Sequence, residues 1–228
     1  MDKITKVRSI TLWIFIIPLI TINICLIIVI YFQEWLALGD GIGPTIPYID
    51  GGTSISRTAR VFPTYFIFKP AMFFTSYLLI KYWLFNKEII SYFDKNHKHI
   101  KKIVFFGIAS AIFLTLHSIF LGIKFDNDFY KLFRRIVILC FIIFEIVAQT
   151  YLVISIYSLK DKLTNLINKK ILLLKMVLVS ILIIVAICSI PIITQSGNKI
   201  LKHALEWDFF VGVITFYLLT FFMWKKNN

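Results

Sequence analysis

Cysteine and histidine are scarce in this sequence of 228 residues, with three and four copies. Cys25, Cys140 and Cys188 all fall inside apolar runs, and no two of them have the C-x-x-C spacing of a zinc or redox site. They are expected to be small buried or lipid-facing residues. The histidines are too dispersed to supply the three or four clustered ligands that zinc needs. We therefore predict no metal and no other cofactor.

Catalytic and phosphate-binding motifs are also lacking: the chain has no G-x-S-x-G, no P-loop and no H-E-x-x-H sequence. Acidic residues number 12 against 25 lysines and arginines, which gives a net charge of +13. The basic residues lie in short clusters at the ends of apolar runs, and no basic stripe interleaved with aromatics occurs. This pattern argues against nucleic-acid binding and favours contact with lipid headgroups.

Long apolar runs dominate what is present. The chain is 59% hydrophobic, whereas soluble domains are about 45–50% apolar. A membrane span needs about 20 apolar residues, and the runs that meet this are 10–32, 63–85, 103–123, 136–158, 171–193 and 205–224. The second is the weakest because Lys69 and Lys81 interrupt it, although long lysine stems near the ends of a span can reach the interface. The sequence predicts an all-α membrane protein, a single domain over 1–228 built as a six-helix bundle.

Lysine and arginine are more frequent in the flanks and connectors on the side of the N-terminus than on the opposite side. The connector around 159–170 and the adjoining Lys175 contribute to this excess. Because basic residues in short loops mark the cytoplasmic side, both termini are expected there. The membrane concerned is not indicated.

Residues 33–64 form a polar segment between the first two runs. Its glycines and prolines are Gly39, Gly41, Gly43, Pro44, Pro47, Gly51, Gly52 and Pro63. That density favours turns over a regular helix, so we expect a structured non-cytoplasmic loop. Arg57 and Arg60 would lie side by side on a helical turn and could grip one phosphate. Alternatively they are solvated, or paired with Asp50.

Polar residues inside the runs are the other candidates. Glu145 lies near the middle of the fourth run, and Gln149 follows one helical turn later on the same face. His117 lies in the outer third of the third run, with Ser110 on about the same face. Such residues mark proton relays or polar pockets, or they clamp helices together through hydrogen bonds. Both interpretations stay open from the sequence.

Short motifs give the chain a resemblance to a known family. They are Pro47-Tyr48-Ile49-Asp50 and Phe62-Pro63 in the polar segment, and Glu206-Trp207 at the last run. With six runs, this pattern resembles the Frag/DRAM/Sfk family of damage-regulated autophagy modulators, which includes membrane proteins needed for lipid remodelling of GPI anchors. The resemblance implies a role in lipid handling. It carries over no catalytic residues, because most members have none established.

The function expected from these observations is lipid-headgroup binding at the non-cytoplasmic face, in support of lipid remodelling or distribution, with no chemistry of its own. The headgroup candidates are Tyr48, Asp50, Arg57, Arg60 and Glu206. One alternative is an intramembrane lipid-modifying enzyme with Glu145 or His117 as base. Another is a small proton-coupled transporter using Glu145 and Gln149. Membrane lipids are the expected partners, and no protein partner is indicated.

Overall fold

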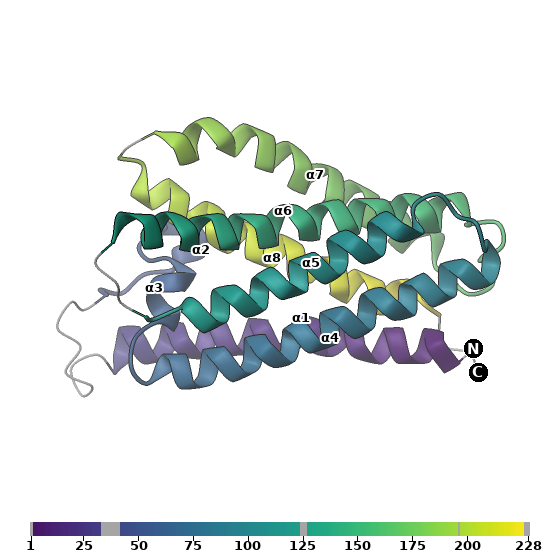
Figure 1. Ribbon diagram of the computed structural model, residues 1–228. Helices are drawn as coiled ribbons and strands as arrows, with labels where there is room; N and C mark the ends of the chain where they lie inside the picture. The colour runs from purple at the N-terminus through teal and green to yellow at the C-terminus, as the bar shows by residue number, and fades with distance from the viewer. Residues whose placement is uncertain (1, 33–41, 124–126, 196, 226–228) are drawn as a thin grey trace.

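The computed structural model describes residues 2–32, 42–123, 127–195 and 197–225. Within them the regular structure is helical, apart from an isolated bridge between Ile167 and Trp224. The helices are α1 Asp2–Tyr31, α2 Pro47–Asp50, α3 Ile55–Ala59, α4 Thr64–Phe93, α5 Ile100–Phe120, α6 Asp128–Ser158, α7 Lys169–Thr194 and α8 Lys199–Met223 (Figure 1). The predicted all-α fold is confirmed.

Five of these helices are long and apolar enough to cross a membrane: α1, α5, α6, α7 and α8. These five helices agree with the predicted multi-pass membrane protein, whereas the predicted count of six spans is not confirmed. Helix α4 has 30 residues, as many as α1. It is not among the five, and it carries Lys69, Lys81 and Lys87, which lower its hydropathy.

The helices extend beyond the apolar runs that predicted them. Helix α1 begins at Asp2 and not at 10, α4 continues to Phe93 and not 85, and α6 begins at Asp128 and not 136. The extra turns carry charged side chains. A helix satisfies its own backbone hydrogen bonds in lipid, at the interface and in water alike, so it does not stop where the apolar run stops. Hydropathy therefore locates the spans but not their ends.

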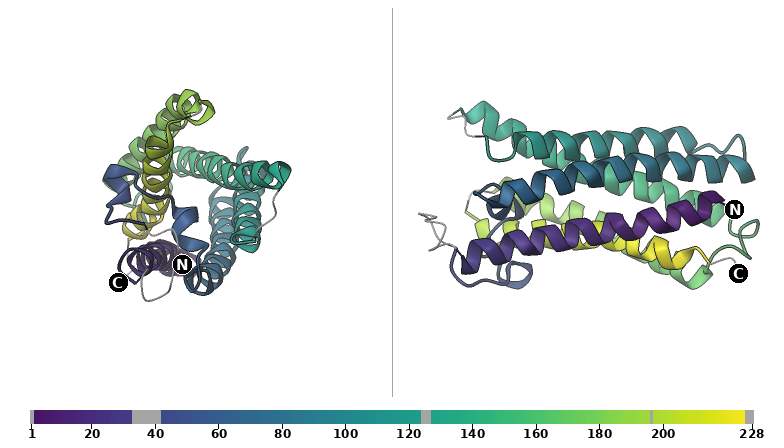
Figure 2. Two further views of the ribbon diagram at one scale, coloured as in Figure 1. Left: turned by 90° about the vertical axis from the view of Figure 1, so that its left-hand side faces the viewer. Right: turned by 90° about the horizontal axis from the view of Figure 1, so that it is seen from below.

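The long helices form a ring in which each packs against the next in the order α1, α4, α5, α6, α7 and α8, and α8 closes on α1. Viewed down its length, the bundle has α7 at its edge (Figure 2). Helix α1 begins and α8 ends at the same end of the bundle, which we call the terminal end. Residues 42–63, with α2 and α3, lie at the other end. We call these residues the cap, and this end the cap end.

Aromatic side chains fill the middle of the ring. Tyr82, Trp83 and Tyr217 are at most 1% exposed. The ring of Tyr82 lies edge-on to Tyr217, with centroids 5.0 Å apart. Gly107 of α5 faces Trp83 so closely that an added Cβ would lie 2.3 Å from the indole ring. The missing side chain therefore lets α4 and α5 approach each other.

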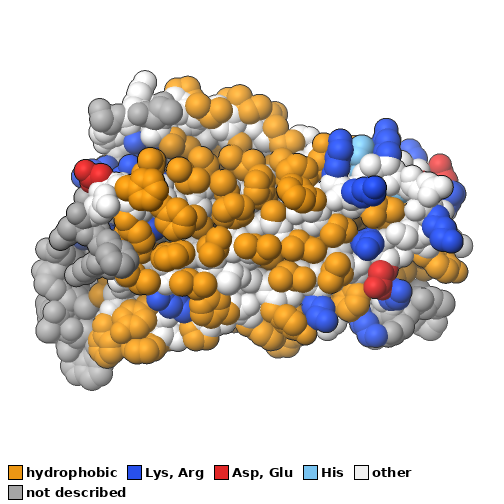
Figure 3. All heavy atoms as spheres, viewed as in Figure 1, with side chains coloured by type: hydrophobic (Ala, Val, Ile, Leu, Met, Phe, Trp, Pro, Cys, Tyr) orange, Lys and Arg blue, Asp and Glu red, His pale blue; other side chains and the backbone are white. Residues whose placement is uncertain are grey.

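The face of the bundle seen in Figure 3 carries a broad apolar belt between its two ends. Helix α7 contributes strongly, with Ile184, Ile187 and Ile190 each more than half exposed. Exposed lysines gather beyond the belt at the terminal end, among them Lys95, Lys98, Lys101, Lys102, Lys169 and Lys170. An apolar band bordered by basic side chains matches the profile of a bilayer.

Candidate functional site

The cap is folded around the carboxylate of Asp50. Its Oδ1 atom accepts a hydrogen bond from the Thr45 hydroxyl and a second one, at 2.9 Å, from the Gly52 amide. Its Oδ2 atom accepts from the Ile46 amide at 2.9 Å. These donors, the Thr45 hydroxyl first, hold the pKa of Asp50 below its ordinary value. Asp50 thus closes the turn around α2, a role that the sequence did not predict for it.

The cap is docked on α8 through residues about 150 positions away. The Trp207 indole donates to the Thr53 carbonyl at 2.8 Å, and the ring of Tyr48 lies edge-on to Trp207 at 4.6 Å between centroids. His203 Nδ1 donates to the Gly51 carbonyl at 3.0 Å. Gly51 adopts a left-handed φ of 59° at the end of α2. Two of the short motifs noted in the sequence, Pro47-Tyr48-Ile49-Asp50 and Glu206-Trp207, therefore meet in space.

Two predicted headgroup candidates take part in this docking. The Glu206 Oε1 atom accepts from the Ser56 amide at 3.2 Å and from the Ser56 hydroxyl at 3.3 Å. Tyr48 donates its hydroxyl to Asn23 of α1 at 3.1 Å. Burial raises the pKa of Tyr48, so its phenol stays protonated. Tyr48 and Glu206 fasten the cap to α1 and α8 and do not line its open pocket.

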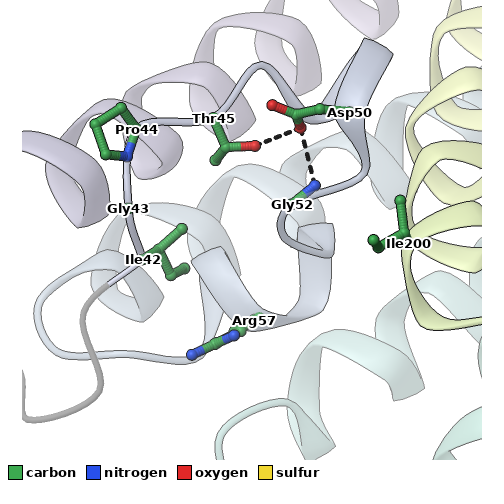
Figure 4. Close-up of a pocket in the computed structure, with 8 residues that line it drawn as sticks. All are labelled: Ile42, Gly43, Pro44, Thr45, Asp50, Gly52, Arg57 and Ile200. Atoms are coloured by element: carbon green, nitrogen blue, oxygen red, sulfur yellow. Dashed lines mark hydrogen bonds between the residues drawn. The ribbon is translucent and has the colours of Figure 1, made fainter.

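An open pocket of about 480 Å³ lies at the cap (Figure 4). Its lining residues are Ile42, Gly43, Pro44, Thr45, Asp50, Gly52, Arg57 and Ile200. Asp50 and Arg57 lie at different edges, with the loop of Pro44 on one side and Ile200 of α8 on the other. The pocket thus presents both signs of charge. Asp40, which belongs to the same predicted loop, lies outside the described residues.

Arg60 follows α3 and lies near two other guanidinium groups. Partial burial lowers its pKa, and the charges of Arg134 and Arg57 lower it further. The sequence predicted the pair Arg57 and Arg60. Arg134 of α6 was missed, and the available signal was the Arg134-Arg135 doublet just before the fourth apolar run.

Glu145 is the centre of a buried polar cluster in the middle of the bundle. It is fully buried, and it accepts hydrogen bonds from Ser110 at 2.6 Å, from Gln149 at 3.0 Å and from the Tyr217 hydroxyl. The donors come from α5, α6 and α8, so the carboxyl links three helices. Gln149 also donates to the Val213 carbonyl at 3.3 Å. The sequence singled out Glu145 and Gln149, whereas nothing in it distinguished Tyr217.

Two other polar residues are buried in the bundle apart from the Glu145 cluster. His117 is buried in the last turn of α5 and is not a hydrogen-bond partner of Glu145. Lys175, which the sequence placed in the basic flank, is 0% exposed. Its amino group donates to the Thr220 hydroxyl at 2.6 Å and lies 3.8 Å from the ring centroid of Phe216. The signal was a lysine inside the apolar sequence ILLLKMVL.

The chain was compared with known proteins at the level of families, of curated sequences and of structures. No family model, no curated protein and no solved structure matches it.

Proposed function

We propose that the protein crosses the membrane six times, with both termini cytoplasmic, and binds phosphate-bearing lipid headgroups at its cap end. In this role it assists lipid remodelling or lipid distribution, as the resemblance to the Frag/DRAM/Sfk family implies, without covalent chemistry of its own. The observation that carries the proposal is the open pocket lined by Asp50 and Arg57.

Helix α4 is the span that completes the six, in addition to the five helices named above. At about 45 Å it is long enough to cross the hydrocarbon core. It stands between α1 and α5 in the ring and runs along their whole length (Figure 1). Lys69 is near its cap end, where its amine donates to the Ile119 carbonyl at 3.2 Å. The exposed lysines of the terminal end support a cytoplasmic location for that end.

The charges at the cap suit a phosphate with an adjoining amine. Arginine binds phosphate through two parallel N–H···O bonds, and the positive charges of Arg57 and Arg134 both act on Arg60 at this end of the bundle. The carboxylate of Asp50 lies on the wall of the same pocket as Arg57. A volume of about 480 Å³ falls within the usual range for small-molecule sites. A zwitterionic headgroup meets both charges.

Exposed apolar side chains also lie within the cap. Ile49 is 81% exposed, Ile46 is 60% exposed and Phe62 is 57% exposed, all within the cap. Large apolar and aromatic side chains at such positions are typical of the membrane interface. They would place the pocket at the depth of lipid phosphates.

The test compares Arg57→Ala/Arg60→Ala with Lys199→Ala/Lys202→Ala, which removes the same charge at the same end of the bundle. Each variant is purified in mild detergent, and the retained phospholipid is measured by native mass spectrometry. Charge-assisted hydrogen bonds contribute about 1.5–3 kcal/mol each, so loss of two arginines should weaken retention by about 100-fold or more. The lysine control should retain lipid as the wild type does. Equal retention by both double variants would refute the proposal.

A further inference from the structure

Polar side chains form a column along one face of α8, inside the bundle. Glu206, Tyr217 and Thr220 are separated by 11 and 3 residues, which places them within roughly 60° of each other around the helix. Glu206 and Thr220 are about 21 Å apart along the axis, about two-thirds of the hydrocarbon thickness of a bilayer. Each has polar groups of other helices beside it.

The middle of the column is the Glu145 cluster. The carboxyl group contacts the hydroxyl groups of Tyr217 and Ser110 directly, at distances that allow proton transfer. The Oε1 atom of Gln149 is buried beside it and has no hydrogen-bond partner within the part of the chain that the structure describes. A buried acceptor of this kind is a position for a water molecule.

The lower part of the column leads toward the terminal end. Tyr217 and Thr220 are one helical turn apart on α8, and the buried hydroxyl of Tyr82 lies beside Thr220. Thr220 in turn accepts the hydrogen bond from the Lys175 amine at 2.6 Å. Lys175 is about 9 Å along α7 from Lys169, where the helix begins. Hydroxyl groups therefore lie between the central carboxyl group and an amine close to the terminal end. The Tyr82 hydroxyl has no hydrogen-bond partner among the described residues, so it marks a position for a bridging water molecule.

Toward the cap end, the column continues as a cavity of about 90 Å³ between the long helices of the ring. Glu206 and Glu145 both line it, together with Tyr217, and most of the remaining wall is apolar. The cavity is large enough to admit water. The carboxyl groups supply hydrogen-bond partners for waters near them. Glu206 is hydrogen-bonded to the cap, so the column reaches from the cap to Lys175.

We propose that this column is a proton-exchange pathway through the bundle, with Glu145 as its central exchanging group and Lys175 as its terminal one. At each step one O–H or N–H bond breaks as the next forms, so a proton enters at one end and leaves at the other without an oxidant, reductant or other reactant. The pathway is independent of headgroup binding at the cap. Proton relays of buried carboxyl groups and hydroxyl groups recur in membrane transporters.

The test uses the full-length protein in phospholipid vesicles that contain a pH-sensitive dye. A potassium gradient with valinomycin drives proton entry, and the rate of internal acidification is measured. The wild type should acidify vesicles faster than protein-free vesicles do. Glu145→Gln and Lys175→Met should each lower the protein-dependent rate by about tenfold or more, because each removes an exchanging group. The matched controls, Glu88→Gln and Lys202→Met, change residues that lie outside the column near the two ends of the bundle, and they should leave the rate unchanged.

Folding of each variant is checked by size-exclusion chromatography and thermal unfolding. Should a variant not fold, Tyr217→Phe replaces it, because this change keeps the buried ring and removes only the hydroxyl. A wild-type rate equal to that of protein-free vesicles would overturn the proposal and leave Glu145 as a structural clamp. So would an unchanged rate in folded Glu145→Gln or in folded Tyr217→Phe.

Discussion

Replacement of Gly51 by alanine should release the cap from α8. Gly51 has a φ of 59°, and an added Cβ would lie 2.0 Å from the Ile200 carbonyl oxygen, a backbone atom that cannot move aside alone. The left-handed conformation costs an alanine about 1–2 kcal/mol. Separation of the two backbones also breaks the hydrogen bond from His203 to the Gly51 carbonyl, which contributes about 1 kcal/mol. Together these terms give about 2–3 kcal/mol.

The assay is hydrogen exchange of the cap amides, followed by mass spectrometry in detergent. A change of 2–3 kcal/mol corresponds to a roughly 30- to 150-fold faster exchange through local opening. The control is Gly43→Ala, because an added Cβ there meets nothing within 4 Å. Exchange in Gly51→Ala at the wild-type rate would refute the account of how the cap is held.

Three further predictions concern buried hydrogen bonds, pH and close packing. Glu145→Leu should lower the free energy of unfolding by about 2–4 kcal/mol, since it leaves the Ser110 and Tyr217 hydroxyls without their acceptor. Thermal unfolding at the wild-type temperature would contradict this prediction. The pKa of Asp50 is below its ordinary value of 3.8, so the stabilisation that its carboxylate gives is present above that pH and is lost as the pH falls through the lowered pKa. Local opening of the cap, measured by hydrogen exchange of its amides, should therefore increase below about pH 4 in the wild type. Asp50→Asn should lack this increase. Gly107→Val should separate α4 from α5 and reduce thermal stability, because its side chain would overlap the facing indole.

Much of the fold could be predicted because lipid imposes a simple rule. Apolar runs of about 20 residues must be helices in a bilayer, and five of the six predicted runs correspond to helices apolar enough to span it. Helix ends could not be predicted from hydropathy, since α1 and α6 continue through charged residues. Gly and Pro correctly indicated turns between 42 and 63, but two short helices form between these turns.

The candidate site was only partly predictable, because roles depend on which residues meet. The charges of Arg57 and Asp50 suggested a polar site, and both line the same pocket. Tyr48 and Glu206 looked like ligand-binding residues, yet they fasten the cap to the helices. Lys175 looked like a residue of the basic flank, because its burial follows from the position of α7 against α8 and not from its own sequence neighbours.

The contact between Arg57 and a lipid phosphate can be measured directly by solid-state NMR. Protein with ¹³C-labelled arginine is placed in phospholipid bilayers, and dipolar coupling between the guanidinium carbon and lipid ³¹P is recorded. The account predicts strong coupling, at the range of a bidentate hydrogen bond, that falls sharply in Arg57→Ala/Arg60→Ala. Coupling that is absent in the wild type, or unchanged in the double variant, would contradict headgroup binding at the cap.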